Sequence, residues 1–225
     1  MTLILFDIDG TLVDSQDILV ECQARTFAAH GLPAPPRERS LSIVGLSLVE
    51  AFTVLTGDAS LAAIMAETYR AQFQDVRADP AFAEPLFHDA DRVLRALASR
   101  PGTRLGICTG KSRRGVDRLL AEHGWAGLFS TIQTADDAPS KPHPAMIIQA
   151  MAETGASPER TLMIGDSTFD MAMAKAAGVR AIAVDWGYHD VPALRAAGAA
   201  AIVSRMEELL CTNELVTQAR QEVQG

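Results

Sequence analysis

The feature that most constrains the fold lies at the amino terminus, where a short apolar run ends in two aspartates. Residues Leu3–Phe6 are all apolar, which is typical of a strand buried on both faces of a parallel sheet. Asp7 and Asp9 follow, and the chain turns at Gly10, so both carboxylates can converge at the end of the strand. There they can bind a cation or divide nucleophilic and acid–base work; two solvated acids in a polar loop are the alternative.

The rest of the chain predicts a helical segment followed by alternating helices and strands. Between Ser15 and Pro85 the periodicity is helical, with no buried strand, and Pro80 and Pro85 mark a returning linker. From Asp89 onward we expect strands at 104–108, 131–133, 161–164, 180–184 and 200–203, separated by helices and followed by a polar carboxyl-terminal helix. This alternation predicts a parallel sheet with helices on both faces.

Composition and charge limit the classes of partner. The 225 residues, 48% apolar and 21% charged, suit one globular core with a smaller inserted unit. A net charge of −8 argues against nucleic acid and anionic membranes as partners. No signal peptide is expected, and no apolar run approaches the roughly 20 residues of a membrane span. Three cysteines without metal-ligand spacing indicate reduced thiols and a cytoplasmic protein.

Polar residues suited to one task follow three more of the expected strands. Thr109-Gly110 offers a hydroxyl and free amides at the start of a helix, which can bind an anion, although a turn and cap is the commoner role. Lys141, one of three lysines, lies between turn-forming residues, so it is either a fixed phosphate contact or a solvated loop lysine. Asp166 and Asp170 either add acids to the same sheet edge or cap the next helix.

Taken together, these motifs resemble those of the haloacid dehalogenase superfamily. Asp-X-Asp-Gly-Thr, Thr-Gly, Lys-Pro and Gly-Asp-X-X-X-Asp occur in that order after successive strands, and the resemblance covers Leu3 to about Ala201. The tract from Ile164 through Tyr188 is most similar to the phosphoglycolate-phosphatase-like branch. One departure is the segment 86–89, where relatives tend to have Pro-Gly; we expect it to affect the hinge more than the chemistry.

The resemblance implies an α/β fold with a helical insertion. Its core would be a doubly wound, Rossmann-like parallel sheet in the order 3-2-1-4-5, formed by residues 1–14 and 86–225. Residues 15–85 would form an inserted helical cap. This order places Asp7 at the topological switch point, where such sheets bind ligands.

The resemblance also implies a mechanism. Asp7 would be the nucleophile that forms an aspartyl-phosphate, and Asp9 would protonate the leaving alcohol and later activate water. Mg²⁺ would be the cofactor, bound by Asp7, the Asp9 backbone carbonyl and Asp166, and Asp170 would orient its waters or the catalytic Lys141.

Phosphate binding and access to the site follow from the same resemblance. Thr109 and the amides at Gly110 would hold the phosphoryl oxygens, while Lys141 would neutralise the nucleophile and the transferring group. The cap would exclude bulk water and select the leaving group.

The expected substrate is a small phosphorylated metabolite, with 2-phosphoglycolate as the best single guess. A carboxylate on the leaving group would need an arginine partner, and Arg37 and Arg39 precede a loop around Gly45 that we expect to face the site. Neither nucleic acid nor a membrane is expected as a partner, and the protein could be a monomer or a homodimer.

Other members of the superfamily supply the alternative functions. A β-phosphoglucomutase-like phosphosugar mutase shares the core, but its cap usually supplies a lysine, and no lysine precedes Lys111. That absence also argues against a phosphonate hydrolase, and Asp9 argues against a dehalogenase. A non-catalytic, phosphate-sensing member would be expected to lack at least one of Asp7, Asp9, Lys141 and Asp166, yet all are present.

Overall fold

A computed structural model, which describes residues 1–211, has a six-stranded sheet at its centre. The strands are β1 (Thr2–Phe6), β2 (Thr103–Cys108), β3 (Phe129–Gln133), β4 (Thr161–Gly165), β5 (Arg180–Val184) and β6 (Ala201–Val203). Their order is β3-β2-β1-β4-β5-β6, and all neighbouring pairs are parallel. The predicted doubly wound sheet in the order 3-2-1-4-5 is therefore confirmed, with β6 added at one edge.

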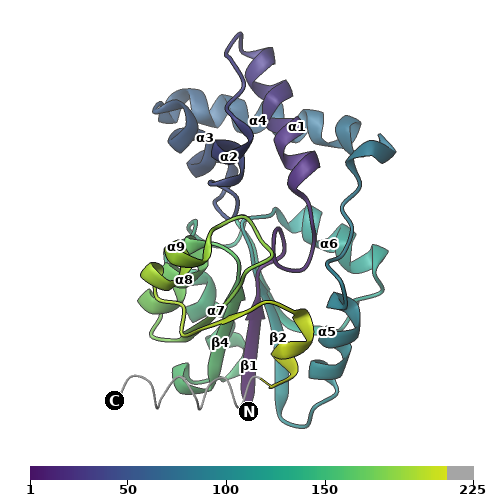
Figure 1. The fold of residues 1–225 in the computed structure, drawn as a ribbon, viewed down its shortest axis with the longest axis vertical. Helices are drawn as coiled ribbons and strands as arrows, with labels where there is room; N and C mark the ends of the chain where they lie inside the picture. Colours follow the sequence, from purple (N-terminus) through teal and green to yellow (C-terminus); the bar gives the residue numbers. More distant parts are fainter. Residues whose placement is uncertain (212–225) are drawn as a thin grey trace.

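Helices cover both faces of this sheet (Figure 1). Ile4 and Phe6 of β1 belong to a buried cluster with α5 (Ala90–Ala98) and α6 (Arg113–Glu122). On the opposite face, Leu3 and Leu5 belong to a second cluster with helices α7 (Ala145–Thr154), α8 (Thr168–Ala176) and α9 (Val191–Ala197). Because successive residues of a strand point to opposite faces, the uninterrupted apolar sequence of β1 is buried on both sides.

A further group of helices lies beyond the end of the sheet toward which β1 runs (Figure 1). It consists of α1 (Gln16–Ala29), α2 (Arg37–Leu41), α3 (Leu48–Thr56) and α4 (Ala59–Arg77). These helices bury their own apolar cluster, which includes Ile18, Phe52 and Tyr69. The separate cluster supports the proposed division into a core of 1–14 and 86–225 and a helical cap of 15–85. The sequence did not predict α2, because a five-residue helix is too short to show a period.

Two linkers join the helical cap to the sheet and pair with each other. Val13 in the outgoing linker forms an antiparallel bridge with Leu86 in the returning one. Asp89, at the end of the returning linker, has a left-handed backbone with φ of 64°, and its carboxylate accepts hydrogen bonds of 2.8 Å from Arg92. An aspartate thus takes a conformation that glycine would adopt without strain.

Short 3₁₀ helices complete the described chain at η1 (Pro80–Phe82), η2 (Pro158–Arg160) and η3 (Met206–Cys211). The polar carboxyl-terminal helix that we expected lies mainly outside the described residues. Within residues 1–211, no helix combines the length and the apolar character needed to cross a membrane.

Candidate active site

The carboxyl ends of the three central strands bring most of the expected site residues together. Phe6 of β1 pairs with Ile107 of β2 and with Ile164 of β4, so the residues that follow these strands meet at one edge of the sheet. Asp7 and Asp166 are 1% and 2% exposed, and Thr109 is equally buried. Polar groups buried at this depth need partners, because burial without them is costly.

Lys141 lies between two of the buried carboxylates. Its Nζ atom is 2.9 Å from Asp7 Oδ2 and 2.6 Å from Asp170 Oδ1. The contact with Asp170 is a hydrogen bond, whereas Asp7 Oδ2 is paired by charge alone and has no hydrogen-bond partner among the described residues. Although burial lowers the pKa of Lys141, the charges of Asp170 and Asp7 raise it above its usual value. Lys141 is therefore a charged group placed against Asp7.

Asp170 orients Lys141 and also begins helix α8. Its Oδ2 atom accepts hydrogen bonds from the Ser167 hydroxyl at 2.6 Å and the Ser167 amide at 3.2 Å, completing a capping box. Gly165 makes room for it, since a Cβ atom there would lie 2.4 Å from Asp170 Cγ. Both Asp170 oxygens are thus already bonded, which favours a supporting role for this side chain.

Asp166 is held by contacts from two segments, one around Thr11 and one around Tyr188. Oδ1 accepts a hydrogen bond from the Thr11 hydroxyl at 3.0 Å, and Oδ2 accepts one from the Tyr188 amide at 2.9 Å. Gly10 and Gly187 leave the space that the carboxylate fills, because a Cβ atom at either position would lie within 2.3 Å of an Asp166 atom. Tyr188 and Gly187 therefore shape the edge of the site through Asp166.

The carboxylates of Asp7, Asp166 and Asp170 form a compact negative cluster. Each offers one oxygen, and these oxygens lie within 4.8 Å of one another. Burial, reinforced by the other carboxylates, raises the pKa of Asp166 to about 8. Burial, opposed by Lys141, raises the pKa of Asp7 to about 6. Three carboxylates and one ammonium leave an excess of negative charge, and oxygen donors suit Mg²⁺, so these residues fit a divalent cation.

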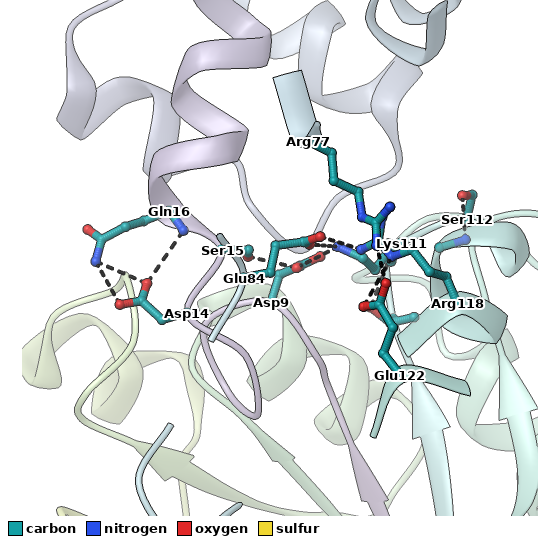
Figure 2. Close-up of polar contacts among 12 residues, drawn as sticks. Asp9, Asp14, Ser15, Gln16, Arg77, Glu84, Lys111, Ser112, Arg118 and Glu122 are labelled. Carbon is teal, nitrogen blue, oxygen red and sulfur yellow. Dashed lines mark hydrogen bonds and ion pairs between the residues drawn. The ribbon is translucent and has the colours of Figure 1, made fainter. Parts of the chain in front are cut away.

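Asp9 has contacts with a serine and a lysine (Figure 2). Asp9 Oδ1 accepts hydrogen bonds from Ser15 Oγ at 2.7 Å and from Lys111 Nζ at 2.8 Å. Sequence reasoning missed both partners. The signal for Lys111 was its position directly after Thr109-Gly110 in a chain with three lysines.

A chain of ion pairs extends from Asp9 to the end of the helical cap, as Figure 2 shows. Lys111 Nζ is 3.1 Å from Glu84 Oε1, and Glu84 also pairs with Arg118 of α6. The chain continues through Glu122 to Arg77, the last residue of α4. Its members are, in order, Asp9, Lys111, Glu84, Arg118, Glu122 and Arg77. Glu84 gave no signal in the sequence, yet it joins the returning linker to the core.

Thr109 and Gly110 lie where a cap loop meets the core. The Thr109 hydroxyl accepts a hydrogen bond from the Lys111 amide at 3.2 Å. A Cβ atom on Gly110 would lie 2.5 Å from the Gly45 carbonyl oxygen, so the two segments touch backbone to backbone. Gly45 itself has a φ of 102°. The loop around Gly45 therefore faces the site.

A cavity of about 580 Å³ lies between the helical cap and the core. Asp7, Asp9, Thr109, Gly110 and Gly45 line it together with apolar side chains of the cap and the arginines Arg70, Arg77, Arg114 and Arg118. The lining does not include Lys141, Asp166 or Asp170, which are buried in the core. Lys141 contacts Asp7 from there.

Arg37 and Arg39 do not take the position that the sequence suggested, and neither lines the cavity. Arg37 binds Asp17 and Gln16 at 2.7 Å on the outer surface of the cap. Arg39 is exposed and donates to the Val54 carbonyl at 3.1 Å. The physical reason is helix α2, which contains both arginines and turns them toward other parts of the cap.

The fold and the site define a class: α/β proteins with a carboxylate-based centre at the switch point of a doubly wound sheet. A family model described as haloacid dehalogenase-like hydrolase matches residues 4–184, and the chain belongs to this family. The suspected family is therefore confirmed.

Relatives and solved structures agree with this assignment. The chain is 35% identical over 193 residues to "Pyrophosphatase PpaX" of Oceanobacillus iheyensis, covering 85% of this chain and 87% of the relative. It is 30% identical over 223 residues to "Phosphoglycolate phosphatase" of Photorhabdus laumondii, covering 97% and 95%. A crystal structure of a putative haloacid dehalogenase-like hydrolase from Bacteroides fragilis matches with a TM-score of 0.82 and 31% identity, covering 92% of this chain and 99% of that one. The chain is a phosphatase-type hydrolase of this family.

Proposed function

We propose that this protein is a Mg²⁺-dependent phosphatase that hydrolyses a small phosphorylated metabolite through an aspartyl-phosphate at Asp7. The observation that carries the proposal is the contact of Asp7 with Lys141, 2.9 Å away, beside the buried Asp166 and at one wall of the cavity. A buried aspartate with a lysine and a cation-binding neighbour is suited to attack on a phosphate dianion.

In the first half of the reaction, an Asp7 oxygen forms a bond to phosphorus as the bond from phosphorus to the leaving oxygen breaks. Asp9 gives its proton to that leaving oxygen. Lys141 offsets the charge of Asp7 and of the transferring group, and Thr109 with the amides near Gly110 holds the phosphoryl oxygens. A Mg²⁺ ion held by Asp7, Asp166 and the Asp9 carbonyl would add positive charge against the repulsion between carboxylate and phosphate.

In the second half, Asp9 is a carboxylate and takes a proton from water. The water oxygen bonds to phosphorus, inorganic phosphate leaves, and the Asp7 carboxylate is regenerated. Asp170 acts through Lys141, which it holds at 2.6 Å. Asp9 is suited to both halves because it lines the cavity and has Ser15 and Lys111 to fix its orientation.

For the substrate, 2-phosphoglycolate remains the first compound to test. Its support is the relative that carries this compound in its name. Arg37 and Arg39 do not support it, because neither lines the cavity. A phosphosugar mutase is the alternative, and the cap contains no lysine of the kind that a mutase usually supplies. The cytoplasmic location stays a prediction, in keeping with three free cysteines.

The test is steady-state hydrolysis of an aryl phosphate followed by a panel of phosphometabolites. We expect turnover that needs Mg²⁺ and Asp7, with Asp7→Asn inactive but folded by circular dichroism. Full turnover by Asp7→Asn would contradict the covalent mechanism. Within the panel, interconversion of hexose phosphates without phosphate release would indicate the mutase instead.

A further inference from the structure

The cavity has a largely apolar wall on the side of the helical cap. Phe52 and Leu55 of α3 and Tyr69 and Phe73 of α4 line it. The rings are in contact, with centroids 5.9 Å apart for Phe52 and Tyr69 and again 5.9 Å for Tyr69 and Phe73. Pockets of about 300–1,000 Å³ bury most of a small organic ligand, and this cavity lies in that range. Glycolate and pyrophosphate are small, highly polar groups that would leave such a wall without contacts.

The positive charges around the cavity are mostly matched by carboxylates. Arg70, Arg77 and Arg118 each form an ion pair with a glutamate, and Lys111 pairs with two carboxylates. Among the arginines and lysines that line the cavity within residues 1–211, Arg114 alone has no ion pair, and its side chain is exposed. On the cap side of the cavity, both arginines, Arg70 and Arg77, are therefore already paired with a glutamate.

A buried polar side chain on this wall, Gln23, has an unused hydrogen-bonding atom. Gln23 is 4% exposed; its Nε2 atom donates to the Ser40 carbonyl, whereas Oε1 has no partner among the described residues. Because buried polar groups are normally satisfied, Gln23 Oε1 points to a bound group that carries a hydrogen-bond donor.

We propose that the substrates are phosphomonoesters of uncharged, mostly apolar alcohols or phenols that carry one hydrogen-bond donor. The inference rests on the proposed phosphatase function and specifies the substrate class of the same site. The phosphate lies at Asp7 and Thr109, the apolar body packs on Leu55 and Phe73, and the donor binds Gln23 Oε1. Each methylene that enters the cavity then raises kcat/KM about fourfold.

The test compares unbranched alkyl phosphates from ethyl to hexyl phosphate with 2-phosphoglycolate and pyrophosphate. The alkyl series is informative because its leaving groups differ in apolar size and hardly in reactivity. We expect kcat/KM to rise about fourfold per methylene until the cavity is filled. Hexyl phosphate should then exceed phosphoglycolate by at least about 100-fold. A flat series, or a preference for phosphoglycolate or pyrophosphate, would overturn the inference.

Variants show whether the rise in kcat/KM depends on the wall of the cavity or on the cap in general. Leu55→Asn should flatten the rise along the series, whereas Ile64→Asn, on the exposed face of α4 with 59% of Ile64 accessible, should keep it. Gln23→Met should lower the preference for 3-hydroxybenzyl phosphate over benzyl phosphate. Equal slopes in Leu55→Asn and Ile64→Asn would count against an apolar subsite at this wall.

Failure of this inference can be told apart from failure of the proposed function. Turnover that depends on Asp7 and Mg²⁺ but shows no apolar trend would leave the phosphatase function standing and remove the substrate class. If no phosphomonoester were turned over, calorimetry would measure binding of the same alkyl phosphates. Affinity that does not grow with chain length would then overturn the inference independently.

Discussion

Glu84 offers the sharpest test of how the helical cap is joined to the catalytic core. The residue lies in the returning linker, and its side chain is 6% exposed while it contacts Lys111 and Arg118. Glu84→Gln keeps the shape of the side chain but removes its charge. Two cations then remain at the interface without the carboxylate that they share.

The size of the effect follows from burial. Removing one partner of a buried ion pair costs about 3–5 kcal/mol, because the remaining charge stays desolvated. A glutamine can still accept a hydrogen bond, so we expect the lower end, about 3 kcal/mol of unfolding free energy. The matched control is Glu67→Gln on α4, whose pair with Arg70 is exposed, and an exposed pair contributes about 0–1 kcal/mol.

The assay is urea unfolding followed by circular dichroism, with equal m values required for the comparison. A double-mutant cycle with Arg118→Met would isolate the pair, and we expect a coupling of at least about 1 kcal/mol. If Glu84→Gln were no more destabilising than Glu67→Gln, the ion-pair chain would not hold the linker, and the reasoning would be refuted.

Further outcomes follow from the metal site and from the two aspartates. Activity should disappear in excess EDTA and return with Mg²⁺, and Ca²⁺ should inhibit because its looser coordination suits both Asp7 oxygens; full turnover in EDTA would remove the metal from the mechanism. Asp9→Asn should lower kcat by about 10²–10⁴-fold without changing the circular dichroism spectrum, and a smaller loss would argue against the proton transfer. Because burial raises the pKa of Asp166 from 3.8 to about 8, the metal-free folded state holds that proton more tightly than the unfolded chain. The stability of the metal-free protein should therefore fall as the pH rises from 3.8 to about 8. Over the same pH range, the increase in Tm that Mg²⁺ produces should grow. Both trends should weaken in Asp166→Asn, measured by thermal unfolding at several pH values.

Local sequence was enough to predict most of the core fold. The expected strand at 180–184 matches β5 residue for residue. The apolar run before Asp7 predicted a strand buried on both faces, and a parallel sheet then brings the residues after each strand to one edge. The period of the apolar residues and the ends of the strands are local properties of the sequence. The convergence of Asp7, Thr109 and Asp166 could therefore be predicted from them, whereas the chemical roles of these residues are still untested predictions.

The contacts of the cap could not be predicted from local sequence patterns, because they join residues far apart in the chain. Arg37 and Arg39 were expected at the site, yet helix α2 turns them to the outside, and periodicity over five residues cannot fix that direction. Lys111 reaches Asp9 across a sequence separation of 102 residues.

The sequence by itself therefore determined the parallel sheet, the order of its motifs and the acids at its edge, since each depends on neighbouring residues. The tertiary structure decided that Asp9 meets Lys111 and which side chains wall the cavity. Both features depend on how the separately packed cap and core are set against each other through Glu84 and the loop around Gly45. Side-chain direction at such an interface is fixed by packing, and no local pattern encodes it.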